Sequence, residues 1–349
     1  MHIFDYSFLK NKTVSPKVLS VSNSVYSLMT WSIVRKQDYG HVFSSLENVA
    51  KIQSIKSSNA IEGIVTSDDR IMAIINGKTM PRNHDELEIA GYRDVLNDIH
   101  SNYENINFCE SDILKMNKLL LFASDEDFAG AYKKFDNAII EIDADGNRRV
   151  RFAPVSASET AQAMQQLTLA YLQASCDSEI SQLLLIPCVI LDFLCIHPFR
   201  DGNGRMSRLL SLLLLYKNGF DVGKYVSFEE QINKYKNTYY ESLRVSSVGW
   251  HENKNDYYPF IENFLSMLYM CYKELDKRFA VVNSNKINKT NRIEATVKNS
   301  LTPISKAEIC SILPDVSPST VESVLGKMMR DGVISKIGSA RNTKYIYNN

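Results

Sequence analysis

Two of the most apolar runs in the chain flank the twelve-residue segment HPFRDGNGRMSR at residues 197–208. The run before it, residues 183–196, contains Asp192 and Pro187 and is shorter than the roughly 20 residues that a membrane span needs. It is therefore predicted to be a core helix, and the run after the segment begins a second one. This arrangement constrains the fold most, because it makes the charged segment a short turn between two apolar helices rather than a flexible surface loop.

Helical periodicity dominates the rest of the chain and predicts a mainly α fold. A first helix is expected to begin at Ser44, which forms a capping-box pattern with Glu47, and to end at Gly63. A second is expected to end at Gly77. Further helices are predicted over residues 84–103, 111–122, 157–174, 180–196, 204–217, 228–247 and 256–281. Residues 135–155 differ, since two β-prone runs around Asp145-Gly146 predict a β-hairpin.

The length and the charge of the chain narrow its class. Its 349 residues are expected to form two or three domains. Lys plus Arg and Asp plus Glu are equal at 40 each, so net charge selects neither nucleic acid nor a membrane surface. The six cysteines show no CxxC or metal-binding spacing, which favours a reducing compartment. The N-terminus does not have the pattern of a signal peptide, so a cytoplasmic protein without membrane contact is predicted.

The composition changes near Asn283, where a polar stretch predicts a linker and a domain boundary. Residues 283–349 carry ten Lys or Arg against five Asp or Glu. A helix, a capped second helix and two short strands follow, which predicts a winged helix-turn-helix. DNA binding is one expectation for this unit. Protein docking or dimerisation is the other, because the second helix offers only Lys327 and Arg330 as basic groups.

The segment 197–208 has the composition of an anion site. It leads into a helix N-terminus, where free backbone N–H groups and the helix dipole attract negative charge. Two glycines allow a ligand to approach the backbone closely, an asparagine adds a side-chain donor, and two arginines three residues apart reach the same face. The predicted polyphosphate cradle comprises Gly202, Asn203, Gly204, Arg205, Met206, Ser207 and Arg208, with Met206 and Ser207 contributing only backbone N–H groups.

Asp201 and His197 add reactive groups beside this cradle. Asp201 would repel phosphate unless a cation lay between them, and Mg²⁺ is commonly held by one carboxylate together with phosphate oxygens. A neutral imidazole at residue 197 can accept a proton from an incoming hydroxyl. The combination predicts attack of an alcohol on a nucleotide phosphate. Neither a Walker A loop nor the kinase signatures HRD and DFG occur in the chain.

Residues 197–208 resemble the complete signature of the Fic domain family, His-x-Phe-x-Asp/Glu-Gly-Asn-Gly-Arg-x-x-Arg, and a looser resemblance extends over residues 40–280. The resemblance implies a mainly helical enzyme that uses Mg²⁺ and ATP to transfer AMP to a Ser, Thr or Tyr hydroxyl of a protein. It implies that His197 is the base, Asp201 the Mg²⁺ ligand and Arg208 the residue that grips the γ-phosphate. The other phosphate ligands that it implies are Gly202, Asn203, Gly204 and Arg205.

A second match lies N-terminal to this signature. Ser58-x-x-x-Glu62-Gly63 resembles the inhibitory motif of the family, Ser/Thr-x-x-x-Glu-Gly/Asn. Ser58 and Glu62 are four residues apart and face the same way on a helix. A glutamate delivered to Arg208 as a bidentate ion pair would occupy the place of the γ-phosphate. The resemblance therefore implies the subclass that carries its own inhibitory helix, here about residues 45–63.

Two weaker matches concern the target and the base. Residues 135–155, preceded by Gly-x-Tyr-Lys at 130–133, resemble the flap with which the family holds a target segment by strand addition. The segment YKNTYYESL at 235–243 resembles the region that lines the adenine pocket. There Tyr239 or Tyr240 could stack on the base.

The sequence leaves three functions open. The first is a self-inhibited protein adenylyltransferase with an N-terminal helical region (1–110), a Fic core (111–282) and a winged helix-turn-helix (283–349). The second is a DNA-binding regulator whose Fic-like part only senses nucleotide. The third uses the same site to remove AMP from a target, with Glu62 positioning water. A homo-oligomer is compatible with each.

Overall fold

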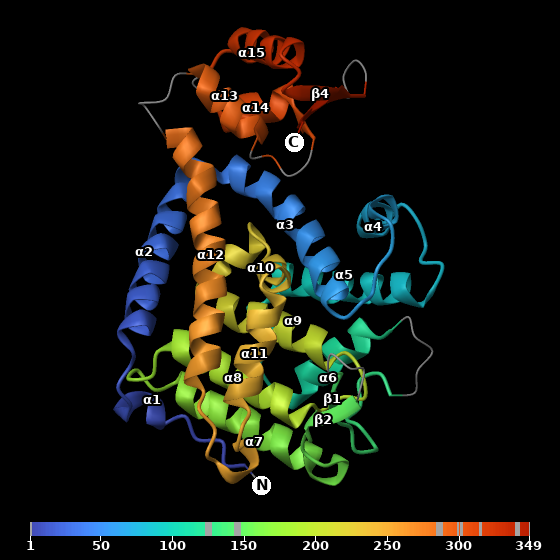
Figure 1. Cartoon of the computed structure of the whole chain (residues 1–349), viewed down its shortest axis with the longest axis vertical. Helices are drawn as coiled ribbons and strands as arrows, with labels where there is room; N and C mark the ends of the chain where they lie inside the picture. The colour runs from blue at the N-terminus through green and yellow to red at the C-terminus, as the bar shows by residue number, and fades with distance from the viewer. Residues whose placement is uncertain are drawn as a thin grey trace.

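The computed structural model describes residues 2–122, 128–142, 148–283, 289–298, 300, 303–313, 316–338 and 343–348. The predicted mainly α fold is confirmed. One apolar core is shared by the helices from the N-terminus to the end of α12 (Tyr258–Asn283), so the expected boundary at residue 110 does not separate two cores. A second, smaller core lies in the C-terminal unit, which sits beyond the end of α12 in Figure 1.

The remaining elements of the larger body follow in chain order. The N-terminal part forms α1 (Phe8–Asn11), α2 (Pro16–Asp38), α3 (Gly40–Ile61), α4 (Asp68–Ile75) and α5 (His84–Asn102). The middle forms α6 (Glu110–Leu120), strands β1 (Ile139–Ile142) and β2 (Arg148–Phe152), α7 (Ala157–Ser175), α8 (Gln182–Ile196) and α9 (Asn203–Lys217). Then come α10 (Phe228–Lys234), α11 (Lys236–Ser246) and 3-10 turns at 221–224 and 250–252.

The two apolar runs form α8 and α9, the expected buried pair. These helices pack against each other, while α7 and α12 cover α8 and α5 covers α9. Helices that are apolar on nearly every side need such complete cover. Their burial fixes both helix ends, and so fixes the place of the turn between them.

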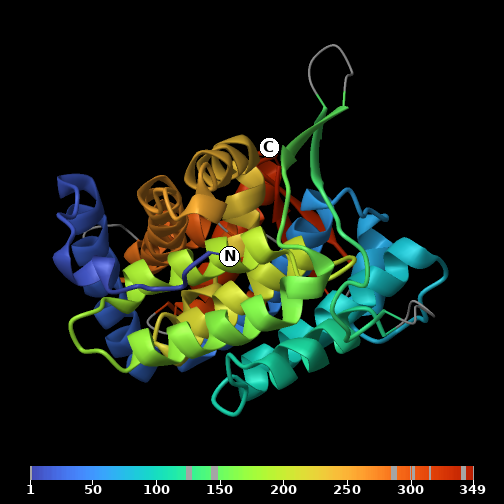
Figure 2. The same cartoon turned by 90° about the horizontal axis from the view of Figure 1, so that it is seen from below.

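The expected β-hairpin is present as the antiparallel pair β1 and β2, with Ile140 opposite Val150. Figure 2 shows the hairpin projecting from the helical body. Asp145-Gly146, on which the hairpin prediction rested, lies outside the described residues. The side chains of Ile140 and Val150 are exposed, so the projecting strands present apolar surface.

Two helix predictions need correction. Helix α3 begins at Gly40, so the predicted capping box at Ser44 is wrong and its hydroxyl bonds the Gly40 carbonyl inside the helix. Phe43 explains the earlier start, because its ring is buried against Phe279 of α12. The helix predicted over 228–247 is interrupted at Tyr235, where α10 ends and α11 begins.

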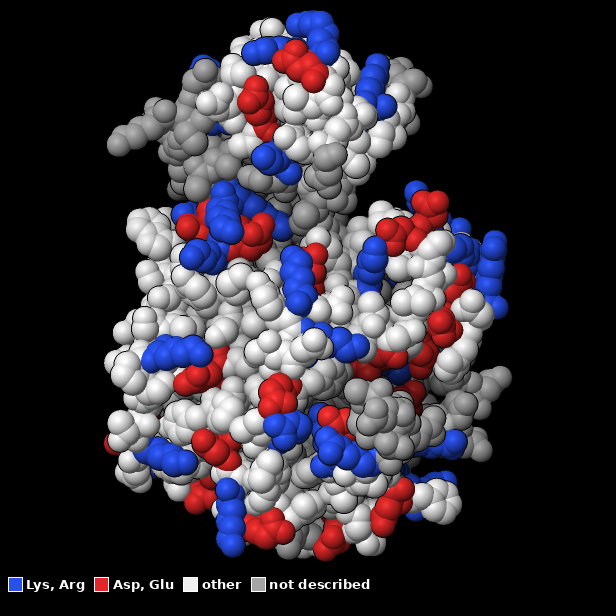
Figure 3. Space-filling view, viewed as in Figure 1, with Lys and Arg blue, Asp and Glu red and all other residues white. Residues whose placement is uncertain are grey.

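The C-terminal unit contains α13 (Lys289–Lys298), β3 (Ile304–Ser305), α14 (Lys306–Ile312), α15 (Pro318–Arg330), β4 (Ile334–Ile337) and β5 (Lys344–Tyr347). The strands form one antiparallel sheet in the order β3-β5-β4. The linker predicted from Asn283 is too long, because residues 289–298 are helical and Ile293 is buried in the small core. Basic and acidic side chains are interspersed over the face in Figure 3. No helix in the described ranges is long and apolar enough to cross a membrane.

Candidate active site

Two residues with left-handed backbone build the turn between α8 and α9. His197 ends α8 at φ +51°, and its N–H donates to the Phe193 carbonyl over 2.9 Å. Gly202 precedes α9 at φ +80°. Glycine adopts this conformation freely, whereas a histidine does so only where its surroundings hold it. The tertiary structure therefore fixes His197 beside the start of α9.

The Asn203 side chain closes this turn. Its Oδ1 accepts from the Phe199 N–H at 2.9 Å, and its Nδ2 donates to the Phe199 carbonyl at 2.8 Å. Both ends of the amide bond the turn, while Nδ2 carries a second N–H, so the prediction that this side chain donates to phosphate stays a prediction. Asn203 also holds the shape of the turn.

A cavity of about 600 Å³ opens beside the turn, within the range of about 300–1,000 Å³ of small-molecule sites. The predicted site residues that line it are Glu62, His197, Asp201, Gly202, Asn203, Gly204, Arg205 and Tyr240. The hairpin contributes Ile139, Ile140, Arg151 and Phe152 to the same wall. The predicted flap and the predicted base therefore face one cavity.

His197 has the protonation state that a base requires. Its Nδ1 lies 3.3 Å from the Leu194 carbonyl oxygen, which favours the proton on Nδ1 and leaves Nε2 to accept one. Burial lowers the pKa of His197 to about 4, the bond to Leu194 opposes this, and the Lys133 ammonium adds to the lowering. The ring is therefore neutral near pH 7.

Residues between α6 and the hairpin hold the carbonyls of the turn. The Lys133 ammonium is buried and donates to the Ile196 carbonyl at 3.1 Å and to the Asn137 side chain at 2.8 Å. Asn137 in turn donates to the carbonyls of His197 at 3.3 Å and Phe199 at 3.2 Å. Lys133 and Asn137, which the sequence placed only before or within the flap, thus hold the carbonyl groups of the turn in place.

Arg205 offers free donors beside the cavity. Its guanidinium is 2% exposed, and Nη2 donates to Glu88 at 2.9 Å and to Asp201 at 3.3 Å. Within the described part of the chain, Nε and Nη1 have no hydrogen-bond partner. Buried donors are rarely left without an acceptor, so these two nitrogens suit an ordered water or an anionic ligand.

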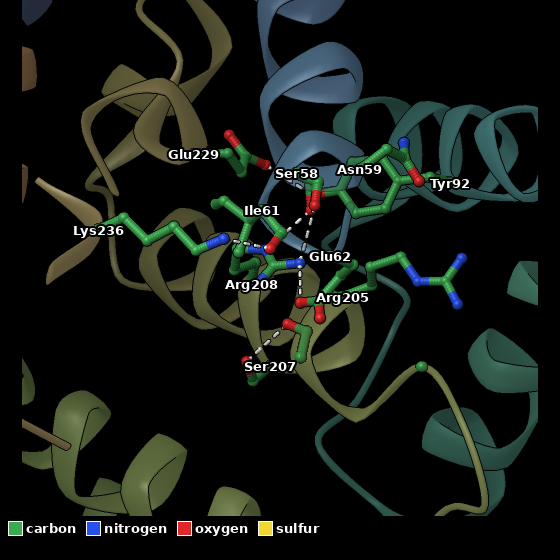
Figure 4. A network of polar contacts seen from close by, with 12 residues as sticks. Ser58, Asn59, Ile61, Glu62, Tyr92, Arg205, Ser207, Arg208, Glu229 and Lys236 are labelled. Atoms are coloured by element: carbon green, nitrogen blue, oxygen red, sulfur yellow. Dashed lines mark hydrogen bonds and ion pairs between the residues drawn. The ribbon is translucent and has the colours of Figure 1, made fainter. Parts of the chain in front are cut away.

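The expected contact between Glu62 and Arg208 is present (Figure 4). Arg208 Nη2 donates to Glu62 Oε1 at 2.7 Å, while Nε donates to the Ser58 hydroxyl at 2.8 Å. Nη2 also donates to the Ser58 carbonyl at 3.0 Å. The ion pair thus uses one guanidinium nitrogen, Nη2, rather than the expected two, while Nε bonds to Ser58.

In the Glu62–Arg208 pair, each side chain stabilises the charged form of the other. Burial alone would raise the pKa of Glu62, but the charge and hydrogen bond of Arg208 outweigh it and leave this pKa below its usual value. Burial likewise tends to lower the pKa of Arg208, whereas Glu62 raises it above its usual value. Both side chains are therefore charged at neutral pH.

Gly63 ends the helix that delivers Glu62. Its φ is +82°, its N–H donates to the Ala60 carbonyl, and the Ile64 N–H donates to the Asn59 carbonyl. This pair of bonds is a Schellman motif, so the prediction that α3 stops at Gly63 is confirmed.

Comparisons with known proteins bear on the domain that carries this site. Residues 107–215 match the model of the Fic/DOC family, and this part of the chain is similar to that family. A Fido domain-containing protein of Dictyostelium discoideum is 27% identical over 143 residues, which cover 38% of this chain and 94% of that protein. Proteins with this domain are typically transferases, and the family generally transfers nucleoside monophosphates to proteins.

Solved Fic structures share the fold. A Fic family protein from Desulfovibrio desulfuricans G20 has a TM-score of 0.63 at 20% identity, covering 97% of this chain and 98% of that one. A Fic domain containing signaling protein from Bacteroides thetaiotaomicron VPI-5482 has a TM-score of 0.60 at 21% identity, covering 75% and 96%. Fic-1 from C. elegans has a TM-score of 0.54 at 19% identity, covering 74% and 73%.

Three predicted residues of the cradle, Met206, Ser207 and Arg208, are not among the residues that line the cavity. The Met206 N–H donates to the Gly202 carbonyl at 2.8 Å, so it is part of the α9 ladder and not a phosphate donor in this conformation. The Ser207 hydroxyl donates to the Gly204 carbonyl at 2.8 Å. The free N–H groups that remain belong to the very start of α9.

The choice between two tyrosines falls on Tyr240. Tyr239 is buried, packs edge-on against Phe260 with ring centroids 5.6 Å apart, and is not among the residues that line the cavity. Tyr240 lines the cavity and stays the candidate that stacks on a base.

The donor set of the Fic site fits one loosely held Mg²⁺ ion. Asp201 lines the cavity with a side chain that is 55% exposed. Within the described ranges, no three His, Cys, Asp or Glu side chains come together as a metal site. Mg²⁺ commonly keeps several waters and takes one or two carboxylates together with phosphate oxygens. Asp201 alone therefore suits a metal that arrives with a nucleotide.

Sequence reasoning missed several residues of the Fic site. They are Glu88, which holds Arg205, Asn137, which holds the turn, Arg151, which lines the cavity, and Lys236, which bonds the end of α3. Each is a single polar residue within an ordinary element or loop. Asn137 and Arg151 lie within the predicted flap at 135–155 and Lys236 within the segment 235–243, but no spacing in the sequence singled out these side chains.

Proposed function

We propose that this chain transfers AMP from ATP to a hydroxyl of a protein in a Mg²⁺-dependent reaction, and that Glu62 restrains the reaction in cis. The observation that carries the proposal is one shared cavity. It is lined by neutral His197, by the exposed carboxylate of Asp201 and by the N-terminal turn of α9. These are the base, the metal ligand and the anion site that the reaction requires.

The proposed step balances as follows. The hydroxyl oxygen of the target bonds to the α-phosphorus of ATP, the bond to the oxygen bridging the α- and β-phosphates breaks, and pyrophosphate leaves. The hydroxyl proton passes to Nε2 of His197, because Nδ1 is directed at the Leu194 carbonyl. The free Nε and Nη1 of Arg205 and the start of α9 stabilise the phosphate charge. Bound Mg²⁺, held by Asp201 and phosphate oxygens, would offset that charge further.

The position of Glu62 supports restraint. A Cβ atom added to Gly204 would lie 2.3 Å from Glu62 Oε1, so the carboxylate rests directly over the cradle. It also engages Arg208, the residue implied to grip the γ-phosphate. A triphosphate bound under these conditions would be displaced, and a displacement of about 1 Å can lower a rate on the order of a hundredfold.

Tyr240 and the β-hairpin suit the nucleotide base and the target protein, respectively. Tyr240 provides an aromatic face for the base of the nucleotide. The hairpin edge offers main-chain groups to an extended target segment, which would fix the target hydroxyl near His197. Binding of DNA or a partner through residues 283–349, and a homo-oligomer, stay predictions.

The test uses the purified full chain and ATP labelled in the α-phosphate. Glu62→Gly should raise AMP incorporation into the chain itself or into an added protein target. Glu62→Gly combined with His197→Ala should abolish it, and intact mass measured with each nucleoside triphosphate would identify the nucleotide.

The opposite pattern would overturn the proposal. If Glu62→Gly gave no AMP incorporation and instead lost the ability to remove AMP from a modified target, Glu62 would serve hydrolysis. Transfer that survived His197→Ala would exclude His197 as the base.

A further inference from the structure

We propose that Lys236 is a positioning residue of the inhibitory helix, which clamps the end of α3 so that Glu62 reaches Arg208. This inference rests on the proposed function, since it concerns the restraint of the same site. The contact that carries it joins α11 to α3, and neither the segment 197–208 nor the motif Ser58-x-x-x-Glu62-Gly63 predicted it.

The Lys236 ammonium contacts the last residue of the inhibitory helix. Its Nζ donates to the Ile61 carbonyl at 2.7 Å, as Figure 4 shows. Ile61 is the final helical residue of α3 and immediately precedes Glu62. The last carbonyls of a helix have no partner within the helix and carry the negative end of its dipole. A cation at this place therefore stabilises the helix end where it now lies.

The interruption between α10 and α11 brings Lys236 to this place. Helix α10 packs along α3, the chain turns at Tyr235, and Lys236 is the first residue of α11. The side chain then extends toward α3 across the gap between the helices (Figure 4). The break that contradicts the predicted single helix is thus the feature that directs this lysine.

The clamp and the ion pair act on adjacent residues. Glu62 is held on one side by Arg208 through its carboxylate, and the backbone just before it is held by Lys236. Burial raises the pKa of Glu62, while the charges of Arg208 and Arg205 lower it. The charge of Lys236 adds a smaller lowering. Loss of the clamp would let the end of α3 move and would weaken the ion pair.

The same ammonium lies close to the candidate base site. Its nitrogen is 5.9 Å from the centroid of the Tyr240 ring, which lines the cavity. The Lys236 side chain therefore lies between Tyr240, the candidate residue for stacking on the nucleotide base, and the end of the inhibitory helix α3. A clamp in this place ties the inhibitory helix to the fixed body of the Fic domain.

The first experiment is a double-mutant cycle in the full chain. Lys236→Met removes the ammonium and keeps most of the stem, Lys236→Arg keeps a cation that can reach the carbonyl, and Lys234→Met is the matched control. Lys234 lies two residues away, and its only ion pair among the described residues is with partly buried Glu230 at 3.5 Å. Each variant is made with Glu62 intact and with Glu62→Gly, and labelled AMP incorporation is measured.

The expected pattern follows from the free energy of a cation at a helix end, which shifts an equilibrium roughly 2- to 30-fold. With Glu62 intact, Lys236→Met should raise incorporation about fivefold within that range, whereas Lys236→Arg and Lys234→Met should not. With Glu62→Gly the same change should give no gain, because no restraint remains to be released. An equal gain in both backgrounds, or no gain with Glu62 intact, would overturn the inference.

A second measurement is independent of activity. The amides of Gly63 and Ile64 bond to carbonyls of α3, so their hydrogen exchange reports how firmly the helix end is held. Lys236→Met should accelerate their exchange, and Lys234→Met should not. Unchanged exchange would overturn the clamp. If no variant transfers AMP, the proposed function fails while this measurement still decides the clamp.

Discussion

The charge of Glu62 can be separated from its shape by the substitution Glu62→Gln. Glutamine keeps the length of the side chain and can still accept a hydrogen bond from Arg208 Nη2 through its amide oxygen. It removes the negative charge that now lies 2.7 Å from that nitrogen. The substitution therefore tests whether the ion pair, rather than the presence of a side chain over Gly204, restrains the site.

The magnitude follows from the kind of bond that is lost. The bond from charged Arg208 to the glutamine oxygen stays charge-assisted, so what is lost is the attraction between two opposite charges. Exposed ion pairs contribute about 0.2–1 kcal/mol, and because Arg208 is buried while the Glu62 side chain is 32% exposed, a loss of about 1 kcal/mol is expected. An equilibrium between restrained and released states would shift about fivefold. Glu62→Gly removes the acceptor as well and should give a larger increase.

The assay measures initial rates of labelled AMP incorporation for the natural chain, Glu62→Gln and Glu62→Gly at one protein concentration. The natural chain should have the lowest rate of AMP incorporation, Glu62→Gln an intermediate rate and Glu62→Gly the highest rate. A thermal melt of each variant serves as the control for folding. If Glu62→Gln were no faster than the natural chain while Glu62→Gly was active, charge pairing with Arg208 would not be the restraint.

Two further predictions concern pH. Asp192 of α8 is buried and accepts hydrogen bonds from Tyr6, Trp250 and Tyr257; burial raises its pKa to about 7 although these bonds oppose the rise. A folded pKa above the unfolded value of about 4 means that the folded state binds more protons between these values, so the free energy of unfolding should fall as pH rises from about 4 to 7. Asp192→Asn should lessen this slope in denaturant titrations followed by tryptophan fluorescence, and an unchanged slope would contradict the assignment. For His197, a pKa of about 4 keeps the base neutral, so kcat/KM of Glu62→Gly should not fall between pH 7 and about pH 5. A loss of kcat/KM with a midpoint near pH 6.5, the ordinary value for histidine, would show that His197 is not the buried base described here.

The short motifs predicted the site because their spacing is local. The segment 197–208 predicted a turn between two buried helices, and the resemblance of Ser58-x-x-x-Glu62-Gly63 to an inhibitory motif implied the contact of Glu62 with Arg208 across 146 residues of chain. Both predictions depended on complete motifs. The sequence did not show that Asn203 also holds the turn or that Tyr239 lies in the core.

The predicted helix boundaries are wrong where tertiary packing overrides the local sequence pattern. Helix α3 extends back to Gly40 because Phe43 is buried against α12. Helix α2 was not predicted individually, since residues 18–34 carry no charge that would mark its exposed face. The chain turns at Tyr235 although helical periodicity continues through it.

The sequence by itself determined the mainly helical class, the buried helix pair and the identity of the reactive groups, because these depend on residue type and spacing within a few turns of chain. Only the tertiary structure decided that Glu88 holds Arg205, that Asn137 supports the turn and that Lys236 bonds the end of α3. Each of these contacts joins residues far apart in the chain. Their free energy comes from burial and from the partners that folding supplies, and single residues carry no local sign of either.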